Sequence, residues 1–170
     1  MASILVFLGL GSNVGSREEN LARGMALLAR SLEVIAASSI YETEPWGISQ
    51  QPPFLNMACR VRTNMAPEEL LLLCQQAERQ VGRKPTFRYG PRVLDIDILA
   101  YGDQVVETAS LVVPHPRLHE RAFVLVPLAE IAPEWEHPVL RKRASQLLEE
   151  VSGRGGVRLW GGPPVVASGG

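Results

Sequence analysis

The sequence predicts an α+β fold of the ferredoxin-like type, a two-layer sandwich with helices on one face of a mostly antiparallel sheet. Strand and helix patterns alternate in the order strand, helix, strand, strand, helix, strand, and the end of the chain is mostly helical. The composition agrees, because 170 residues with 46% hydrophobic and 21% charged residues suit one soluble domain with a buried core. The other face of the sheet is then open for a ligand.

The first strand and helix are predicted from residues 4–32. Residues 4–10 form an apolar run, and we expect a turn at the glycines around its end, Gly9, Gly11 and Gly15. Ser16 and Glu19 have the spacing of a capping box, which marks the start of a helix. The apolar face of this helix is formed by Leu21, Met25, Leu28 and Leu32. Residues 32–40 predict a second strand.

A long connection and a third strand follow. Residues 41–53 predict a loop, and long loops in compact domains are often functional, so Trp46 either covers the core or contacts a ligand. In the strand that begins at Phe54, alternation places Phe54 and Asn56 on one face. An aromatic ring beside a carboxamide can bind a flat heterocycle, but ordinary exposed strand residues give the same pattern. The residues expected to face the core are Leu55, Met57, Cys59 and Val61.

The second helix begins at Pro67 and ends at Gly82. Its apolar stripe contains Leu70, Leu73, Cys74, Ala77 and Val81. Glu78 and Arg79 lie off this stripe. Residues 82–89 then predict a basic loop that leads directly into a strand with two acids. Because basic side chains lie next to fixed anions, this segment is suited to binding a triphosphate with its metal ions.

The two acids, Asp95 and Asp97, lie within an apolar and β-branched run at residues 93–99. Because side chains alternate along a strand, both carboxylates share one face. The opposite face is formed by Leu94, Ile96 and Ile98. The acids need positive charge nearby, since burial of unpaired carboxylates costs several kcal/mol. Two alternatives supply it: ion pairs with Arg88 and Arg92, or hard divalent cations held together with substrate phosphates.

The last part of the chain predicts short strands and helices. Residues 105–113 suggest one or two edge strands, and residues 123–131 and 145–151 suggest helices, with a late start or a kink at Pro127. Residues 114–123 are rich in phosphate-binding groups, and Pro116 between His115 and His119 argues against a helical zinc site. We therefore expect a domain at residues 1–152 and a Gly/Pro-rich tail at 153–170, with a possible added strand at 157–160.

Charge and cysteine content limit the classes of partner. The net charge of −1 argues against binding along a nucleic acid, and the composition suggests no membrane span. Two basic clusters favour a small anionic ligand instead. The first contains Arg79, Arg83, Lys84, Arg88 and Arg92, and the second contains Arg117 and Arg121 with His115 and His119. Cys59 and Cys74 lie in apolar runs, as free buried thiols do, and no signal peptide precedes the first strand. We expect a cytoplasmic monomer.

Several ordered blocks together indicate a family. They lie at residues 8–13, 39–47, 54–56, 88–99 and 113–123, and the block at 88–99 reads Arg-Tyr-Gly-Pro-Arg-Val-Leu-Asp-Ile-Asp-Ile-Leu. These blocks resemble the 6-hydroxymethyl-7,8-dihydropterin pyrophosphokinase family of folate biosynthesis. The resemblance covers about residues 4–151 and is more specific than a single motif.

The resemblance implies transfer of a diphosphate from ATP to the hydroxymethyl group of the reduced pterin, with AMP as the second product. The two magnesium ions would be held by Asp95 and Asp97, and the catalytic residues would be Asp95, Asp97, Arg83 and Arg92. The pterin would contact Thr43, Pro45, Trp46, Phe54, Asn56 and Phe123. The nucleotide would contact Glu78, Arg83, Arg88, Arg92, Ile98, His115 and Arg121. Asp97 is one candidate for the proton acceptor.

Three positions depart from the pattern of some relatives. Tyr89 stands where some have tryptophan, and Ser110 and Val112 replace an arginine and a threonine, so nucleotide contacts there are not expected to carry over. Two other functions remain open. A metal-dependent phosphohydrolase or nucleotidyltransferase would use the same acids and arginines but would not need a ring pocket. A binding module without activity would explain the sheet but not the convergence of charges on one face.

Overall fold

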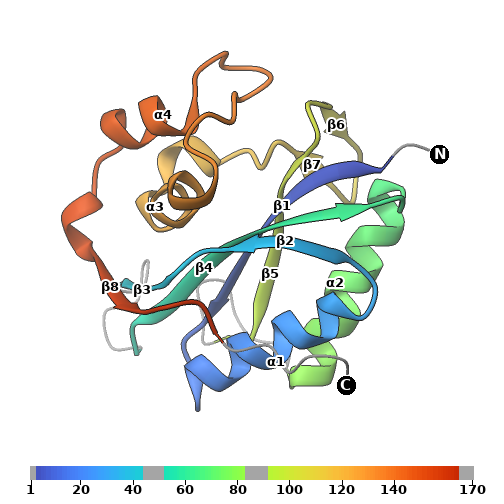
Figure 1. The fold of residues 1–170 in the computed structure, drawn as a ribbon, viewed down its shortest axis with the longest axis vertical. Coiled ribbons are helices and arrows are strands. Elements are labelled where there is room, and N and C mark those ends of the chain that lie inside the picture. Colours follow the sequence, from blue (N-terminus) through green and yellow to red (C-terminus); the bar gives the residue numbers. More distant parts are fainter. Residues whose placement is uncertain (1–2, 44–51, 83–91, 165–170) are drawn as a thin grey trace.

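The computed structural model describes residues 3–43, 52–82 and 92–164 and confirms an α+β fold with a mostly antiparallel sheet (Figure 1). The strands are β1 (Ile4–Ser12), β2 (Glu33–Ala37), β3 (Ile40–Thr43), β4 (Phe54–Thr63), β5 (Asp95–Tyr101), β6 (Val106–Glu107), β7 (Val112–Val113) and β8 (Val157–Gly161). The α-helices are α1 (Arg17–Ala29), α2 (Pro67–Val81), α3 (Ala122–Ile131) and α4 (Ala144–Glu150). Two short 3-10 helices span Leu118–Glu120 and Arg154–Gly156.

A six-stranded antiparallel sheet forms the centre of the molecule, in the order β5-β1-β4-β3-β8, and β2 pairs with the other end of β4. The single strand expected at residues 32–40 is divided, because Ser38 is buried between β2 and β3 and its hydroxyl accepts a hydrogen bond from the Ala58 N–H at 2.9 Å. The edge strands expected at 105–113 form a separate two-stranded sheet, β6-β7. The added strand expected at 157–160 is confirmed as β8, which pairs with β3.

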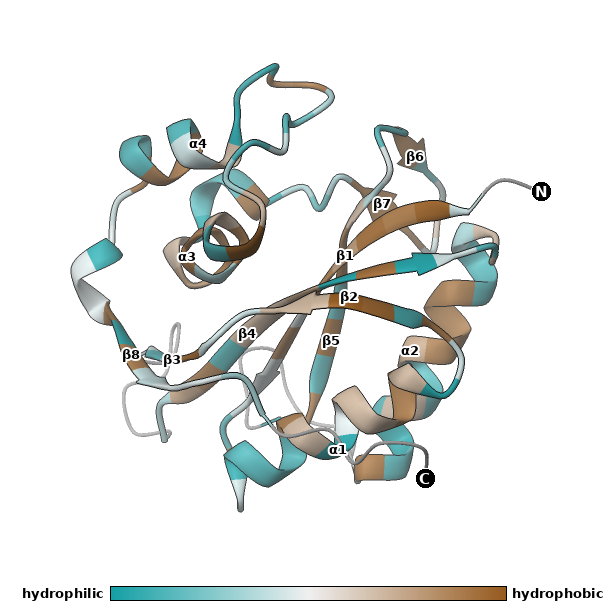
Figure 2. Cartoon of the chain, viewed as in Figure 1, coloured by the Kyte–Doolittle hydropathy of each residue, from teal (hydrophilic) through white to brown (hydrophobic). Residues whose placement is uncertain are grey.

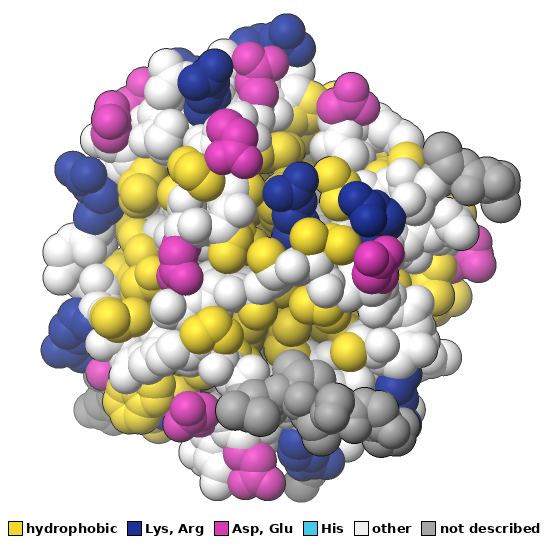
Figure 3. Space-filling view, in the orientation of Figure 1, with side chains coloured by type: hydrophobic (Ala, Val, Ile, Leu, Met, Phe, Trp, Pro, Cys, Tyr) yellow, Lys and Arg dark blue, Asp and Glu magenta, His cyan; other side chains and the backbone are white. Residues whose placement is uncertain are grey.

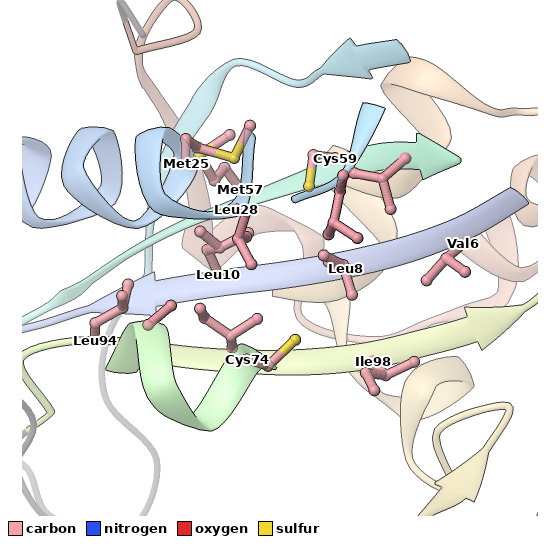
Figure 4. Packing of buried hydrophobic residues seen from close by; sticks show 14 of the residues in the cluster. Val6, Leu8, Leu10, Met25, Leu28, Met57, Cys59, Cys74, Leu94 and Ile98 are labelled. Carbon is pink, nitrogen blue, oxygen red and sulfur yellow. The ribbon is translucent and has the colours of Figure 1, made fainter. Parts of the chain in front are cut away.

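The main hydrophobic core lies between the sheet and helices α1 and α2. Figure 4 shows Met25 and Leu28 of α1 and Cys74 of α2 packed against Leu8 and Leu10 of β1. Figure 2 shows hydrophobic residues along β1 and β2 and on α2. Each fully buried leucine of this kind contributes about 1.5–3 kcal/mol to stability. The predicted apolar faces of both helices and of β4 are therefore confirmed.

A second, smaller core lies on the opposite face of the sheet, under α3 and α4. Phe7 of β1 and Leu99 of β5 pack there against Leu125, Leu128 and Leu147 of the two helices. Figure 1 shows α3 and α4 on the far side of the sheet from α1 and α2. Helices were expected on one face of the sheet only. Helices α1 and α2 fit this expectation, whereas α3 and α4 cover part of the other face. Apolar residues at the alternate strand positions require a cover on the second face as well.

Helix ends agree only in part with the sequence pattern. Pro67 and Gly82 delimit α2 as expected, and Gly82 has the left-handed φ of 117° that glycine tolerates. The capping box at Ser16 is wrong, because its side chain makes no cap hydrogen bond. The Asn20 side chain instead donates to Ser12 Oγ and to the Val14 carbonyl, at 3.2 and 2.9 Å, and closes the turn before α1. Pro127 lies inside α3, which begins before it.

The surface and the cysteines fit the composition. On the face shown in Figure 3, basic and acidic side chains are interspersed around a hydrophobic centre. Within the described ranges, no helix has the length and hydrophobicity needed to cross a membrane. Cys59 and Cys74 are free and buried, and burial raises the pKa of each thiol to about 12. Both thiols therefore act as apolar core residues.

Candidate active site

A cleft of about 170 Å³ opens on the sheet face opposite α1 and α2, next to α3. Its residues come from the β5, β1, β4 and β3 strands, from the segment before β5 and from the start of α3. They are Gly9, Leu10, Gly11, Thr43, Phe54, Asn56, Met57, Ala58, Arg92, Asp95, Asp97, Leu99, Arg117, Arg121, Phe123 and Val124. Acids, arginines and aromatic rings that lie far apart in the sequence therefore meet in one place.

The acidic pair lies on β5. Asp95 and Asp97 are half-buried and line the cleft, whereas Leu94, Ile96 and Ile98 are buried in the main core. The predicted alternation is therefore confirmed. Among the residues that the structure describes, no group of three His, Cys, Asp or Glu side chains is placed to hold a metal ion. Two carboxylates that leave further positions to water and phosphate oxygens are the donor set that suits Mg²⁺.

Two glycines of β1 form the floor of the cleft beside the acids. In the antiparallel register Gly9 pairs with Asp97, and Gly11 pairs with Asp95 on one side and with Asn56 on the other. A Cβ at Gly11 would lie 2.9 Å from Asn56 Oδ1, so a side chain there would displace the carboxamide. The sequence pattern predicted a turn at both glycines, which is wrong; of the three glycines only Gly15 lies in the turn, with φ 72°. Their alternation with buried leucines was the signal of a strand.

The aromatic part of the cleft is formed by β3, β4 and α3. Thr43 pairs with Phe54 across the two strands, and Asn56 Nδ2 lies 3.4 Å from Thr43 Oγ1. Phe123, at the start of α3, lines the same cleft from above the sheet, and the Arg121 guanidinium lies 5.5 Å from its ring centroid. The predicted residues Pro45 and Trp46 lie outside the described residues.

Three arginines within the described part of the chain line the cleft. Arg92 precedes β5, and Arg117 and Arg121 flank the 3-10 helix before α3. Arg117 was not among the predicted site residues, although it belongs to the basic cluster recognised in the sequence. The predicted residues Arg83 and Arg88 lie outside the described residues.

His115 lies beside the cleft but does not line it. The backbone N–H of His115 donates to the Leu99 carbonyl at 2.9 Å, and the ring Nδ1 accepts the backbone N–H of Arg117 at 3.1 Å. Burial, with the positive charges of Arg121 and Arg117, lowers the pKa of His115 to about 4. Because Nδ1 is an acceptor, the neutral ring carries its proton on Nε2. A contact between His115 and the nucleotide stays a prediction.

Glu78 and Ile98 lie on the other side of β5. Glu78 is only 5% exposed, and its carboxylate accepts the Ile96 N–H at 2.8 Å, so the expectation that it lies away from the packed face of α2 is wrong. Ile98 is 4% exposed within the main core. Neither lines the described cleft, and their nucleotide contacts stay predictions.

Asn13 was not among the predicted site residues, and it joins three segments behind the cleft. The side chain is fully buried, with Oδ1 accepting the Arg92 N–H at 2.6 Å and Nδ2 donating to the Pro52 carbonyl at 3.2 Å. Its backbone N–H donates to the Arg92 carbonyl at 2.9 Å. Asn13 therefore holds the backbone of one cleft arginine. The Gly-Ser-Asn sequence at the end of β1 is the signal of it in the sequence.

The positions that depart from the family pattern have other partners. Ser110 Oγ donates to Glu68 Oε2 at 2.9 Å, and Thr108 Oγ1 donates to the other oxygen of that carboxylate at 3.1 Å. Val112 is part of β7. These contacts attach the β6-β7 hairpin to the start of α2.

A carboxylate pair, arginines and a ring pocket on one face of an α+β sheet define a phosphotransferase that acts on an aromatic substrate. Sequence comparison identifies the family: the 7,8-dihydro-6-hydroxymethylpterin-pyrophosphokinase (HPPK) family matches residues 7–133. The chain belongs to this family.

Individual relatives agree. The chain is 44% identical over 145 residues to a 2-amino-4-hydroxy-6-hydroxymethyldihydropteridine pyrophosphokinase of Aquifex aeolicus, covering 85% of this chain and 91% of that protein. It is also 44% identical over 158 residues to the enzyme of the same name from Bacillus subtilis, covering 92% of this chain and 90% of that protein. A crystal structure of Plasmodium falciparum HPPK-DHPS has the same fold, with a TM-score of 0.73 and 16% identity over 88% of this chain. This chain spans 45% of that longer chain.

Proposed function

We propose that the chain transfers diphosphate from ATP to the hydroxymethyl group of 6-hydroxymethyl-7,8-dihydropterin and releases AMP, as a step in folate biosynthesis. The observation that carries this proposal is the convergence of Asp95, Asp97, the cleft arginines and the ring pocket on one sheet face. A hydrolase or a nucleotidyltransferase would need the acids and arginines but not the pocket formed by Phe54, Asn56 and Phe123.

The reaction forms a bond between the pterin hydroxymethyl oxygen and the β-phosphorus of ATP. The bond between that phosphorus and the oxygen on the α-phosphorus breaks, and AMP leaves with the electron pair. Two Mg²⁺ ions, when bound, would neutralise the phosphate oxygens and lower the pKa of the attacking hydroxyl. Asp95 and Asp97 would hold these ions, and Asp97 is the proposed acceptor of the hydroxyl proton.

The remaining residues would position the two substrates. Thr43 and Asn56 offer hydrogen bonds to the edge of the pterin, and Phe54 and Phe123 offer aromatic faces to its ring. Arg92 and Arg121 would bind the triphosphate, since guanidinium groups pair with phosphate oxygens and stabilise charge in the transition state. Arg83, Arg88, Pro45, Trp46, Glu78, Ile98 and His115 are proposed to complete the two binding sites.

Incubation of the protein with ATP and Mg²⁺, with and without the reduced pterin, tests this function, and AMP is measured. The proposal predicts AMP only when the pterin is present, together with one equivalent of pterin diphosphate. AMP or free phosphate without the pterin would identify a hydrolase. No product in either case would leave a binding protein and would refute the proposal.

We also propose that the chain acts as a cytoplasmic monomer. Two free, buried cysteines support a reducing compartment. Light scattering coupled to gel filtration tests the monomer, which requires a mass close to 18.6 kDa.

A further inference from the structure

The C-terminal strand β8 is attached to the ring-binding end of the cleft by four side chains, which we call the Arg17 cluster: Arg17, Glu42, Arg158 and Trp160. β8 lies beyond residue 133, where the family match ends. Figure 1 shows β8 beside β3, with the chain running towards α1 after it. The strand is thus part of the sheet that carries the cleft.

The contacts within the Arg17 cluster are short. Arg17 Nη1 donates to Glu42 Oε2 at 2.9 Å and to the Pro53 carbonyl at 2.8 Å. Arg158 Nη2 donates to the other Glu42 oxygen, also at 2.9 Å. The Arg17 guanidinium lies over the Trp160 ring, 4.9 Å from its centroid, in a cation–π contact. One carboxylate is therefore shared by a guanidinium from α1 and one from β8.

Burial distinguishes the two arginines. The Arg17 and Glu42 side chains are 19% and 17% exposed, whereas Arg158 is 62% exposed. An ion pair that is largely shielded from water interacts more strongly than an exposed one. Trp160 contributes to this shielding, since its ring covers the guanidinium. The ion pair between Arg17 and Glu42 therefore depends on β8 for part of its shielding from water.

The cluster lies directly behind the ring-binding residues. Thr43 pairs with Phe54 on β4 and with Val157 on β8, and the preceding residue Glu42 pairs with Arg158. Alternation turns Glu42 away from the face that carries Thr43. Arg17 thus joins Glu42, which precedes Thr43, to Pro53, which precedes Phe54. One guanidinium thus adds a link to the backbone pairing of the two strands, at the point where both ring-binding residues begin to line the cleft.

We propose that β8 positions the pterin pocket: Trp160 and Arg158 hold Arg17 and Glu42 in the geometry that sets the separation of Thr43 and Phe54. This inference rests on the proposed function. The phosphate side of the cleft, at β5 and Arg92, is separated from β3 by the two strands β1 and β4. Loss of the cluster should therefore weaken pterin binding selectively, and residues 157–161 belong to the functional domain.

The test measures the dissociation constants of the reduced pterin and of a non-hydrolysable ATP analogue with Mg²⁺, together with kcat. Trp160→Ala and Arg158→Ala should each weaken pterin binding by roughly fivefold, with kcat and nucleotide affinity within about twofold of wild type. Trp160→Phe, which keeps an aromatic face over Arg17, should restore most of the affinity. Leu159→Ala is the matched control, because Leu159 is 69% exposed on the same strand and its side chain points away from Arg17.

Three outcomes would overturn the inference. Wild-type pterin affinity in both the Trp160→Ala and Arg158→Ala variants would show that the cluster does not act on the pocket. Equal losses of pterin and nucleotide affinity, shared by Leu159→Ala, would show that β8 only stabilises the sheet. If the wild-type protein binds no pterin at all, the proposed function itself is wrong. If the wild type binds pterin and both variants bind it equally well, only the role of β8 is wrong.

Discussion

His115 borders the cleft as an uncharged side chain at neutral pH. Burial and the charges of Arg121 and Arg117 lower its pKa to about 4. In the proposed nucleotide contact it would donate the N–H of Nε2 without adding a charge, and Arg92, Arg117 and Arg121 carry the positive charge among the described cleft residues. The place of His115 in a basic cluster of the sequence suggested a cation instead.

The lowered pKa of His115 predicts a pH-dependent stability. In the unfolded chain the ring titrates near 6.5, so between about pH 6.5 and 4 the unfolded state binds more protons and the free energy of unfolding falls as the pH falls. His115→Gln should reduce this fall by about 1–2 kcal/mol, a discounted figure because the ring is partly exposed. Urea unfolding at pH 7 and pH 4.5 measures the difference.

The control for this experiment is Leu159→Ala, which changes a side chain that is 69% exposed and carries no titrating group. It should leave the pH dependence of stability close to that of the wild type. A His115→Gln variant that loses stability with falling pH as steeply as the wild type would contradict the assigned charge state.

The sequence predicted some individual side chains of the cleft and missed others for a physical reason. Asp95 and Asp97 were placed correctly because alternation along one strand needs no knowledge of its neighbours. Gly11 and Asn13 act through partners on other segments, Asn56 and Arg92. Their roles depend on strand register and on chain returns that no local pattern contains.

At the scale of elements, Glu78 connects α2 to the strand that carries the acids. β5 is an edge strand, and the buried Glu78 carboxylate accepts the N–H of Ile96, which lies between Asp95 and Asp97. Among the described strands none pairs with this side of β5, and the hydrogen bond supplies the partner of the Ile96 N–H. It also fixes the backbone from which both carboxylates project.

We predict that Glu78→Ala lowers the free energy of unfolding by about 2–3 kcal/mol, because the buried Ile96 N–H loses its acceptor. Glu78→Gln keeps an acceptor oxygen and should retain most of the stability. Chemical unfolding and steady-state kinetics with ATP measure the two variants. A raised KM for ATP in Glu78→Gln at wild-type stability would support the proposed nucleotide contact, and a Glu78→Ala variant as stable as the wild type would contradict the role of the hydrogen bond.

The elements themselves were predictable where hydrophobic periodicity is long and regular. The faces of α1 and α2 follow from it, and so do the ends of α2, because Pro67 and Gly82 restrict the backbone. The division of β2 from β3 at Ser38 was not predictable, because the hydroxyl binds a backbone group of β4. The hydrogen bonds of Asn20 to Ser12 and Val14 likewise depend on the fold of the turn before α1.

At the scale of the whole molecule, one sheet is covered on both faces but to different extents. The main core lies under α1 and α2, and the smaller core under α3 and α4 occupies only part of the opposite face. The part that remains open contains the carboxylates, the arginines and the ring pocket. The second core thus holds the start of α3, and with it Arg121 and Phe123, against the cleft.

Asp95 and Asp97 are proposed to hold the divalent cations that bring the triphosphate to the ring pocket. The most direct test is the binding of Mn²⁺, in place of Mg²⁺, followed by electron paramagnetic resonance with a non-hydrolysable ATP analogue and the pterin. The wild type and the exposed control Asp103→Asn should bind about two ions per chain, and Asp97→Asn should lose at least one of them. Binding of two ions by Asp97→Asn with wild-type affinity would contradict the account.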